Sequence, residues 1–175
     1  KALEFWYSAD PKSSNWWHNE IATPQALGEL LIMMHSGSKK LDAALQARLI
    51  ERMKRGDVET KTGANKTDIA LHYFYRALLT NDKPLLDNSV EELFYPVQLV
   101  YQKEGLQYDY AYLQHGPQLQ ISSYGAVFIT GVLKLANYVR DTPYAMSTKK
   151  LELFSKYYRE SYLKVIRGSY IDFNV

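Results

Sequence analysis

A histidine and a tyrosine are the first pair of residues in the sequence that could do chemistry together. His115 lies in a segment rich in tyrosine and glutamine, and Tyr124 opens a long apolar stretch nine residues later. Ser122 or Ser123 is placed to cap a helix beginning at Tyr124, which would put the phenol near an electropositive helix end. Such a pair could exchange a proton with a bound molecule. A tyrosine packed in a first helical turn and a histidine hydrogen-bonded within its loop explain the same spacing.

A tyrosine that acts as a base must be partly ionised, whereas the reference pKa of its phenol is about 10. Lowering a phenol pKa by about two units takes about 2.7 kcal/mol. A helix end supplies only about 0.3–1 kcal/mol. Another cation, or the geometry of the bound substrate, must therefore supply the rest.

Asn65, within "TGANKTD", is predicted at the start of a helix. A side-chain amide there can donate to an anionic or carbonyl oxygen of a ligand, alongside free backbone N–H groups. Asparagine is also simply favourable where a helix begins, so a structural role explains the same position.

Two adjacent tryptophans, Trp16 and Trp17, stand in "NWWHNE", which we expect to form a turn. Their ring faces could stack against sugar rings. The polar neighbours that could bind sugar hydroxyls are Asn15, His18, Asn19 and Glu20. Tandem tryptophans are also common as plugs of a hydrophobic core.

Other catalytic and metal-binding patterns are missing from the sequence. It contains no HExxH, GxSxG, P-loop or GxGxxG motif. Neither His18 with Glu20 nor His35 with His72 has a spacing specific for a metal ion. The absence of cysteine excludes a disulfide scaffold, a thiolate nucleophile and a cysteine-based zinc site. No metal site is predicted.

Composition narrows the class further. With 175 residues, of which 46% are hydrophobic and 23% charged, the chain is predicted to fold around a sizeable core. The net charge of +2 gives no case for nucleic acid or a membrane surface as partner. No apolar run approaches the roughly 18 residues of a membrane span.

The elements that must position these residues are predicted to be helices, because apolar residues recur at helical spacing along most of the chain. Lys1 to Tyr7 resembles the middle or end of a helix, so we expect a piece of something longer. Six helices are expected. The third begins near Ala64, and the others run from Thr23 to Gly37, from Leu41 to Met53, from Pro84 to Tyr101, from Tyr124 to Arg140 and from Ser147 to Ile166. Without strands or a sequence repeat, the fold class is all-α. Helical hairpins curling into a toroid are favoured over an extended solenoid.

Two segments stand out from this pattern. The stretch 103–123 is predicted to be a loop of about twenty residues, and loops of that length are usually functional or disordered. Its aromatic content argues against disorder. The helix over 124–140 is apolar on nearly every face, so we expect it to be buried.

A modest excess of cationic residues lies between Arg48 and Lys66. This stretch could border an acidic polymer, or it could be a solvated helix face.

Four separated segments carry a family resemblance, in the order "NWWHNEIATPQALGELL", "TGANKTDIALHYFYRALL", "YLQHGPQLQISSYGAVF" and "IRGSYIDFNV". Together they span nearly the whole chain. They resemble the polysaccharide lyase family that includes chondroitin AC lyase, hyaluronate lyase and xanthan lyase, and most of all its chondroitin AC type. The resemblance implies an incomplete (α/α) toroid of helical hairpins, of which residues 1–175 would be one part.

The implied reaction is β-elimination at the uronic acid of chondroitin sulfate or hyaluronan, leaving a 4,5-unsaturated product. By resemblance, Tyr124 would abstract the C5 proton and protonate the leaving oxygen, while His115 would assist it. Asn65 would neutralise the uronate carboxylate. The residues implied in substrate binding are Trp16, Trp17, Asn15 and Gln114.

The resemblance also implies what lies elsewhere. Earlier helices would precede Lys1, and arginines, a catalytic glutamate and β-sheet domains would follow Val175, so we expect the 175 residues alone to have little or no activity. No cofactor is required for the chemistry of these residues, and the expected partner is an acidic polysaccharide. A bacterial periplasmic or secreted location is implied, although the chain shows no signal-peptide pattern.

Other function classes remain open. A hyaluronate or xanthan lyase would share the same residues. A glycoside hydrolase on a helical toroid would need two carboxylates across a cleft, for which Glu20 and Asp109 are the only plausible pair. A non-enzymatic glycan-binding module is the third possibility. Apolar hairpin faces left bare would favour self-association of the chain.

Overall fold

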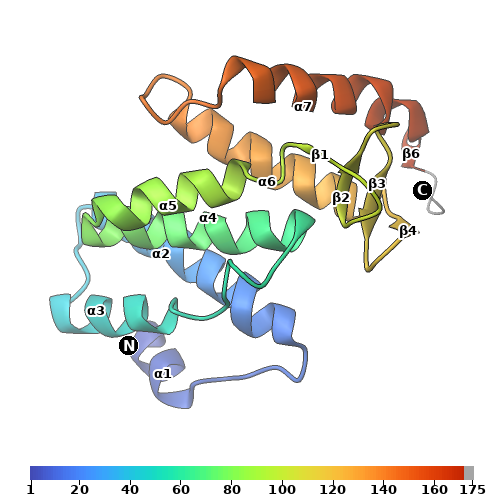
Figure 1. Ribbon diagram of the computed structural model, residues 1–175. Helices are drawn as coiled ribbons and strands as arrows, with labels where there is room; N and C mark the ends of the chain where they lie inside the picture. Colours follow the sequence, from blue (N-terminus) through green and yellow to red (C-terminus); the bar gives the residue numbers. More distant parts are fainter. Residues whose placement is uncertain (172–175) are drawn as a thin grey trace.

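The computed structural model describes residues 1–171. Its helices are α1 (Ala2–Ala9), α2 (Thr23–Ser36), α3 (Ala43–Arg52), α4 (Gly63–Thr80), α5 (Lys83–Phe94), α6 (Tyr124–Val139) and α7 (Thr148–Glu160). α1 and α3 lie at one end of the molecule and α7 at the other, with α2, α4, α5 and α6 between them (Figure 1). The pairs α2/α3 and α4/α5 are successive hairpins in contact. α7 packs on α6 through Phe154 and Phe128, whose ring centroids lie 6.0 Å apart. These helices form part of an incomplete (α/α) toroid. The predicted helical class is confirmed.

Side-chain caps explain where several helices begin. The Asp42 carboxylate accepts the Leu45 N–H at 2.9 Å before α3, and Asp82 accepts the Leu85 N–H at 2.9 Å before α5. Each carboxylate satisfies one of the backbone donors that a first helical turn leaves unpaired. At the other end of α4, Asn81 takes the left-handed conformation with φ 52°, which stops the helix.

Two predicted helices are shorter than expected. α5 ends at Phe94 rather than at Tyr101, because Pro96 has no backbone N–H with which to continue the helical hydrogen bonds. α7 ends at Glu160, and the remaining residues form the 3-10 turn η2 (Tyr162–Val165).

The start of α2 also differs from the prediction. Thr23 does not cap a helix, since its φ of −64° and ψ of −49° are helical. Helical backbone begins already at Trp16 and runs into α2 through the π-helical turn η1 (His18–Ala22). The Asn15 side chain accepts the Trp17 N–H at 3.0 Å and caps this longer helix. Trp16 and Trp17 therefore stand in a first helical turn and not in a loop.

The stretch 103–123 is a small sheet rather than the expected loop. Its strands are β2 (Gly105–Gln107), β3 (Tyr112–Gln114) and β4 (Gln118–Leu119). They are joined by β1 (Leu99–Val100), which comes just before the stretch, in the order β1-β2-β3-β4. β1 pairs parallel to β2, while the β2–β3 and β3–β4 pairs are antiparallel. Strands of two or three residues are too short to produce an alternating pattern, so the sequence hid them.

A second antiparallel pair follows η2. It joins β5 (Ile166–Arg167) to β6 (Tyr170–Ile171). The last four residues of "IRGSYIDFNV", 172–175, lie outside the described residues.

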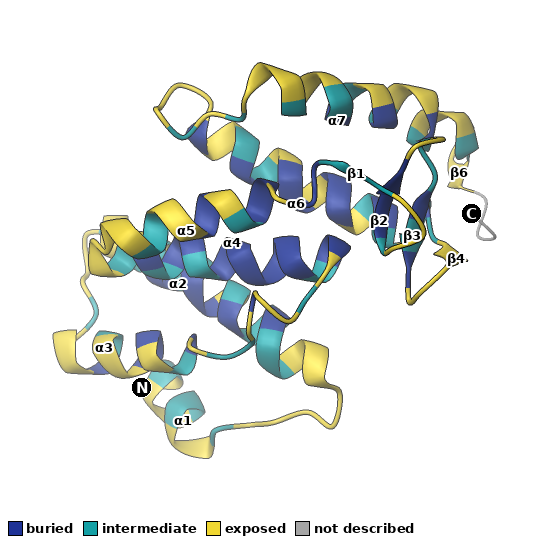
Figure 2. Cartoon of the chain, in the orientation of Figure 1, coloured by how far each residue is buried: buried dark blue, intermediate teal, exposed yellow. Residues whose placement is uncertain are grey.

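The core is built around α4, which is buried along most of its length (Figure 2). It packs against α2 and against α6. Glycines allow both approaches, because a Cβ on Gly28 would lie 2.7 Å from the Tyr75 Cβ, and one on Gly131 would lie 2.7 Å from the Thr67 Cγ2. Helices can approach this closely only where a side chain is missing.

α6 is only partly buried, contrary to the prediction from its apolar sequence. Val127 is 41% exposed, Leu133 48% and Tyr138 49%. The helix thus keeps exposed apolar side chains on more than one of its faces. Among residues 1–171, no helix combines the length and the apolar character needed to cross a membrane.

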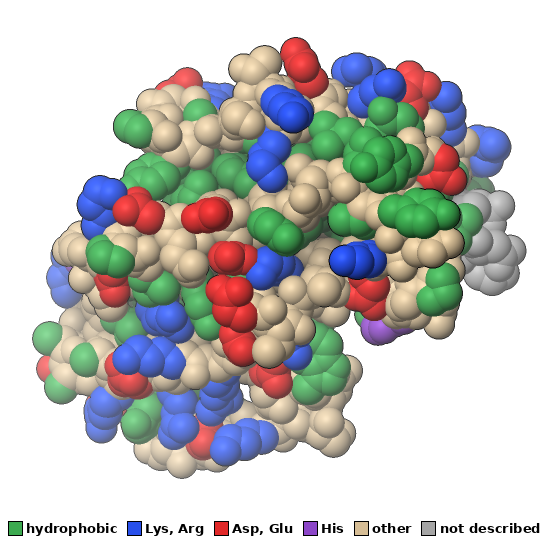
Figure 3. Space-filling view, in the orientation of Figure 1, with side chains coloured by type: hydrophobic (Ala, Val, Ile, Leu, Met, Phe, Trp, Pro, Cys, Tyr) green, Lys and Arg blue, Asp and Glu red, His purple; other side chains and the backbone are tan. Residues whose placement is uncertain are grey.

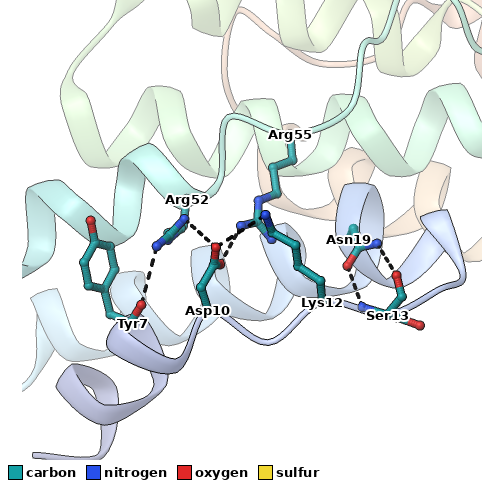
Figure 4. A network of polar contacts seen from close by, with 7 residues as sticks. All are labelled: Tyr7, Asp10, Lys12, Ser13, Asn19, Arg52 and Arg55. Carbon is teal, nitrogen blue, oxygen red and sulfur yellow. Dashed lines mark hydrogen bonds and ion pairs between the residues drawn. The ribbon is translucent and has the colours of Figure 1, made fainter.

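An ion-pair network ties the N-terminal segment to α3 (Figure 4). The Asp10 carboxylate contacts the guanidinium groups of Arg52 at 3.0 Å and Arg55 at 2.8 Å. The hydrogen bond from Arg55, with the charges of both arginines, holds the pKa of Asp10 below its usual range. Further along, the Asn19 side chain accepts the Ser13 N–H at 3.0 Å and donates to the Ser13 carbonyl at 2.8 Å. These contacts fix the segment that leads to the tryptophans.

Most cations of the basic stretch 48–66 are therefore paired. The ion pairs are Arg52–Asp10, Lys54–Glu51, Arg55–Asp10, Lys61–Glu20 and Lys66–Glu92. Acidic and basic side chains are interspersed over the part of the surface formed by α1 and α3 (Figure 3). Because its cations are paired with acidic side chains, this stretch is neither a free cationic surface nor a helix face that contacts only solvent.

Gly131→Ala tests the close packing of α6 on α4. We expect the free energy of unfolding to fall by about 1–3 kcal/mol, because the new methyl group overlaps the Thr67 side chain. Denaturant unfolding followed by circular dichroism measures the change. Gly37→Ala is the control, since its φ is −73° and the nearest atom to a Cβ there is 3.5 Å away. Equal stability of the two variants would contradict close packing at Gly131.

Candidate active site

The structure brings His115 and Tyr124 into direct contact. His115 follows β3 in the turn to β4, and Tyr124 is the first residue of α6. The His115 Nε2 lies 2.7 Å from the Tyr124 hydroxyl oxygen. The two rings meet edge to face, with centroids 4.8 Å apart and an interplanar angle of 87°. His115 is exposed and Tyr124 is half-buried, so the pair is open to a ligand.

Backbone conformation aims the imidazole at the phenol. His115 has φ 57° and Gly116 has φ 75°, so two consecutive left-handed residues turn the chain between β3 and β4. A left-handed conformation is uncommon for a residue with a side chain, although histidine adopts it more readily than most. The hydrogen bond to Tyr124 helps to hold it.

The pair can hold one proton in two ways. The phenol O–H donates to an unprotonated Nε2, or a protonated Nε2 donates to the phenolic oxygen. This arrangement suits proton transfer to and from a bound molecule. In residues 1–171, no lysine or arginine side chain bonds to the Tyr124 hydroxyl or lies over its ring. The remainder of the energy would have to come from the geometry of the bound substrate or from a cation outside the described residues.

Ser123, one of the two serines predicted to cap α6, does not cap it. Ser123 is the residue before α6, but its side chain makes no capping hydrogen bond. Its hydroxyl donates to the Gln120 side chain instead. The Gly125 N–H is satisfied by the Gln120 carbonyl at 2.8 Å.

Asn65 is the third residue of α4, as predicted for a helix start. Its side chain is half-buried and makes no hydrogen bond to any described residue. The amide is therefore available to a ligand. Gly63 begins the helix with φ 52°, in the left-handed region, and a Cβ there would overlap the Gln114 side chain.

A buried amide and a carboxylate join the start of α4 to the turn that carries His115. Gln114, 1% exposed, accepts the Ala64 N–H through Oε1 at 3.3 Å and donates from Nε2 to the Glu104 Oε2 at 2.6 Å. The Glu104 Oε1 accepts the Gly116 N–H at 2.9 Å. Asn65 directly follows Ala64, and His115 directly follows Gln114. The hydrogen bond between Ala64 and Gln114 therefore ties together the backbone segments that carry both candidate site residues. Gln114 thus has a positioning role, and its contact with substrate stays a prediction.

The two tryptophans and Asn15 stand at the N-terminal end of the helix leading into α2. Trp16 is 40% exposed and Trp17 is 39% exposed, so neither is a core plug. Trp17 meets the His18 ring edge to face at 5.1 Å. Trp16 lies beside Lys61, which comes just before α4. The side-chain oxygen of Asn15 accepts the capping hydrogen bond from Trp17, and the residue as a whole is exposed.

The carboxylate pair of the glycosidase alternative has other partners. Glu20 forms an ion pair with Lys61 at 3.2 Å. Asp109 accepts the Ala111 N–H at 3.0 Å in the turn between β2 and β3. Within the described part of the chain, no three histidine, aspartate or glutamate side chains gather closely enough to hold a metal ion.

Sequence reasoning missed a buried carboxylate one helical turn below Asn65. Asp68 is 8% exposed and lines a cavity of about 280 Å³ between α2, α4 and α6. The Gln25 Nε2 donates to the Asp68 carbonyl at 2.9 Å and to its Oδ1 at 3.4 Å. Burial raises the pKa of Asp68 to about 6, against the opposing effects of Gln25 and Lys134. The available signal was the position of this acidic residue directly before the apolar residues Ile69 and Ala70.

His72, one turn further along α4, is also buried. Neither ring nitrogen makes a hydrogen bond of ordinary geometry to a described residue, although the backbone of Glu20 favours the charged ring. Burial, together with the charge of Arg76, lowers the pKa of His72 to about 3.

The fold agrees with comparisons to known proteins. The family model described as polysaccharide lyase family 8, N-terminal alpha-helical domain, matches residues 1–175. The chain therefore belongs to polysaccharide lyase family 8, within its N-terminal α-helical domain.

Individual relatives are similar over most of the chain. Chondroitinase-AC of Pedobacter heparinus is 78% identical over 175 residues, which are 100% of this chain and 25% of that protein. Hyaluronate lyase of Staphylococcus aureus is 23% identical over 174 residues, covering 90% of this chain and 22% of that protein. The chain thus spans about a quarter of the length of these relatives.

Solved structures agree with this assignment. A chondroitinase AC lyase studied as enzyme–oligosaccharide complexes superimposes with a TM-score of 0.97 at 78% identity, over 99% of this chain and 26% of that chain. The chondroitin AC lyase of Streptomyces coelicolor A3, in complex with chondroitin sulphate, gives a TM-score of 0.85 at 19% identity, over 97% and 24% of the two chains. The second likeness shows the fold alone.

Asp68→Asn tests the buried carboxylate through its pH dependence. The folded-state pKa of about 6 lies above the reference value of 3.8, so the folded state binds more protons between these values. The stability that Asp68 contributes is therefore present below about pH 4 and lost as the pH rises through 6. We expect the variant to be more stable than the parent by about 1–3 kcal/mol at pH 8 and equal to it near pH 4.

Chemical denaturation at several pH values measures this difference. His72 acts in the opposite sense, because the stability that its neutral ring contributes is lost as the pH falls from 6.5 towards about 3. His72 is present in both proteins, so its effect cancels in the comparison. Asp109→Asn, at an exposed turn, serves as the matched control. A difference that did not change with pH would show that the Asp68 carboxyl is not held in a desolvated site.

Proposed function

We propose that this chain is part of a lyase that cleaves glycosaminoglycans of the chondroitin sulfate and hyaluronan type by β-elimination. The observation that carries the proposal is the 2.7 Å contact between His115 Nε2 and the Tyr124 hydroxyl at the start of α6. Family membership and the 78% identity to a chondroitinase-AC support it. Specificity of the chondroitin AC type is favoured over that of hyaluronate or xanthan lyases for the same reason.

In the proposed reaction Tyr124 takes the proton from C5 of the uronic acid. The C5–H electrons form the C4=C5 double bond, the C4–O bond breaks, and the Tyr124 proton passes to the leaving glycosidic oxygen. Asn65 donates its amide N–H to the uronate carboxylate, where negative charge develops in the transition state. No electrons are gained or lost overall, so the proposal needs no redox cofactor, and it assigns the neutralisation of the carboxylate to Asn65 instead of a metal ion.

The tryptophans and the remaining parts of the molecule belong to the same proposal. Trp16 and Trp17 offer exposed ring faces for stacking of the sugar chain, and Asn15 lies beside them. The 175 residues are proposed to be one part of a longer catalytic domain, since they match a quarter of the relatives' length. A location in the periplasm or outside the cell follows if the substrate is a long polymer, because such a polymer does not reach the cytoplasm intact.

Tyr124→Phe in the full-length protein tests the proposal. Removing the hydroxyl is expected to lower kcat by at least about 100-fold, because it removes the group that moves the proton. Substrate binding should stay nearly unchanged, since the ring and its surroundings remain. Formation of UV-absorbing unsaturated oligosaccharide from chondroitin measures turnover.

Tyr108→Phe is the matched control, because Tyr108 is 67% exposed and makes no hydrogen bond to His115, Tyr124 or Asn65. Turnover of Tyr124→Phe at a tenth of the parent rate or more would refute Tyr124 as the base. A saturated product would point to hydrolysis instead.

Self-association of the isolated chain is a separate proposal. An apolar groove of about 630 Å³ lies between α2, α4 and α6. Its rim holds exposed apolar side chains, with Met33 65%, Leu78 45% and Tyr138 49% exposed. Apolar surface of this kind favours a second copy at high concentration.

Light scattering of the 175-residue chain measures this association. We expect the mass to rise above that of a monomer with concentration, and Met33→Glu to shift the equilibrium back to the monomer by placing a charge in the groove. A monomeric mass of the parent at high concentration would contradict the proposal.

A further inference from the structure

One lysine links the tryptophan pair to the start of α4. The Lys61 ammonium lies 4.1 Å from the centroid of the Trp16 ring and 3.2 Å from the Glu20 Oε2. The Lys61 and Glu20 side chains are only 25% and 33% exposed, so both contacts are partly shielded from water. A cation over an indole face is attracted by the negative ring quadrupole.

The position of Lys61 gives these contacts a further meaning. Lys61 immediately precedes the Thr62 cap of α4 and stands four residues before Asn65. Trp16 and Glu20 lie about one turn apart on the helix that leads into α2. A single ammonium group therefore joins the two segments that present the aromatic platform and the carboxylate-binding amide.

The geometry favours a positioning role over direct contact with an anion. The ammonium covers one face of the indole, and Trp16 remains 40% exposed for a ligand on the rest of its surface. The Glu20 carboxylate balances the charge of Lys61, which leaves little net attraction for an anionic sugar. What the pair of contacts does supply is a fixed orientation of the ring.

We propose that Lys61 is a positioning residue for sugar binding, which holds the Trp16 indole in its stacking orientation and in register with the start of α4. This inference rests on the proposed function, in which Trp16 is part of the sugar platform. Lys61 moves no proton and touches no reacting atom.

Lys61→Met in the full-length protein is the first test, because it keeps the length of the side chain and removes its charge. We expect KM for chondroitin to rise about three- to tenfold, with kcat within about twofold of the parent and an unchanged pH profile. Lys61→Arg should restore the parent KM, since a guanidinium can also lie over the ring and pair with Glu20. Lys54→Met is the matched control, because Lys54 pairs with Glu51 at 2.6 Å on the surface and contacts no tryptophan.

A double-mutant cycle distinguishes positioning from direct contact. In a Trp16→Leu background, Lys61→Met should produce no further rise in KM, because the ring that it positions is gone. The dependence of KM on salt should also stay that of the parent. Additive effects, or a weaker salt dependence, would show that Lys61 meets the anionic polymer itself and would overturn the proposal.

Fluorescence supplies a readout that does not depend on turnover. Subtracting the emission of Trp16→Leu from that of the parent isolates the Trp16 emission, and Lys61→Met should shift it and make it more accessible to acrylamide. An unchanged Trp16 emission together with an unchanged KM would overturn the proposal. If the parent yields no unsaturated product, the proposed lyase function fails, whereas the fluorescence comparison still tests the contact between Lys61 and Trp16.

Discussion

The hydrogen bonds that join Gln114 and Glu104 to the start of α4 are the contact on which the candidate site depends. Gln114 is buried, and its amide can satisfy both of its polar atoms only while the turn carrying His115 stays against the first turn of α4. A buried amide without partners would cost about 1–3 kcal/mol. Gly63 makes the approach possible, since any side chain there would overlap Gln114. Buried groups that need not touch a substrate therefore hold the candidate site residues in place.

Rigid helix packing extends this constraint to the other side chains. α4 lies between α2 and α6 with glycine at each closest approach, so its neighbours have little room to slide. Tyr124 begins α6, and the tryptophans begin the helix that continues as α2. Residues on three separate helices thus keep a fixed relation, as a reaction that moves a proton over a short distance requires.

The helices and the chemical residues were predictable from the sequence, because helical periodicity is a long signal and the four family segments are distinctive. The sheet inserted before α6 was not predictable, since strands of two or three residues leave no pattern and are held by pairing and by Glu104. The burial of α6 was overestimated, because apolar composition does not reveal which neighbours are present. Asp68 escaped notice for a related reason, since only the folded chain shows that its carboxyl faces a cavity.

The π-helical turn η1 carries the tryptophans at its N-terminal end. A π turn accommodates one residue more than an α turn. The five residues His18–Ala22 therefore advance the helix by about the same rotation as four residues of α-helix. Deleting one residue there would restore α-helical winding and leave the segment before it facing nearly the same side. A change of one codon in this turn would thus shorten the helix by a residue and keep Trp16 beside Lys61.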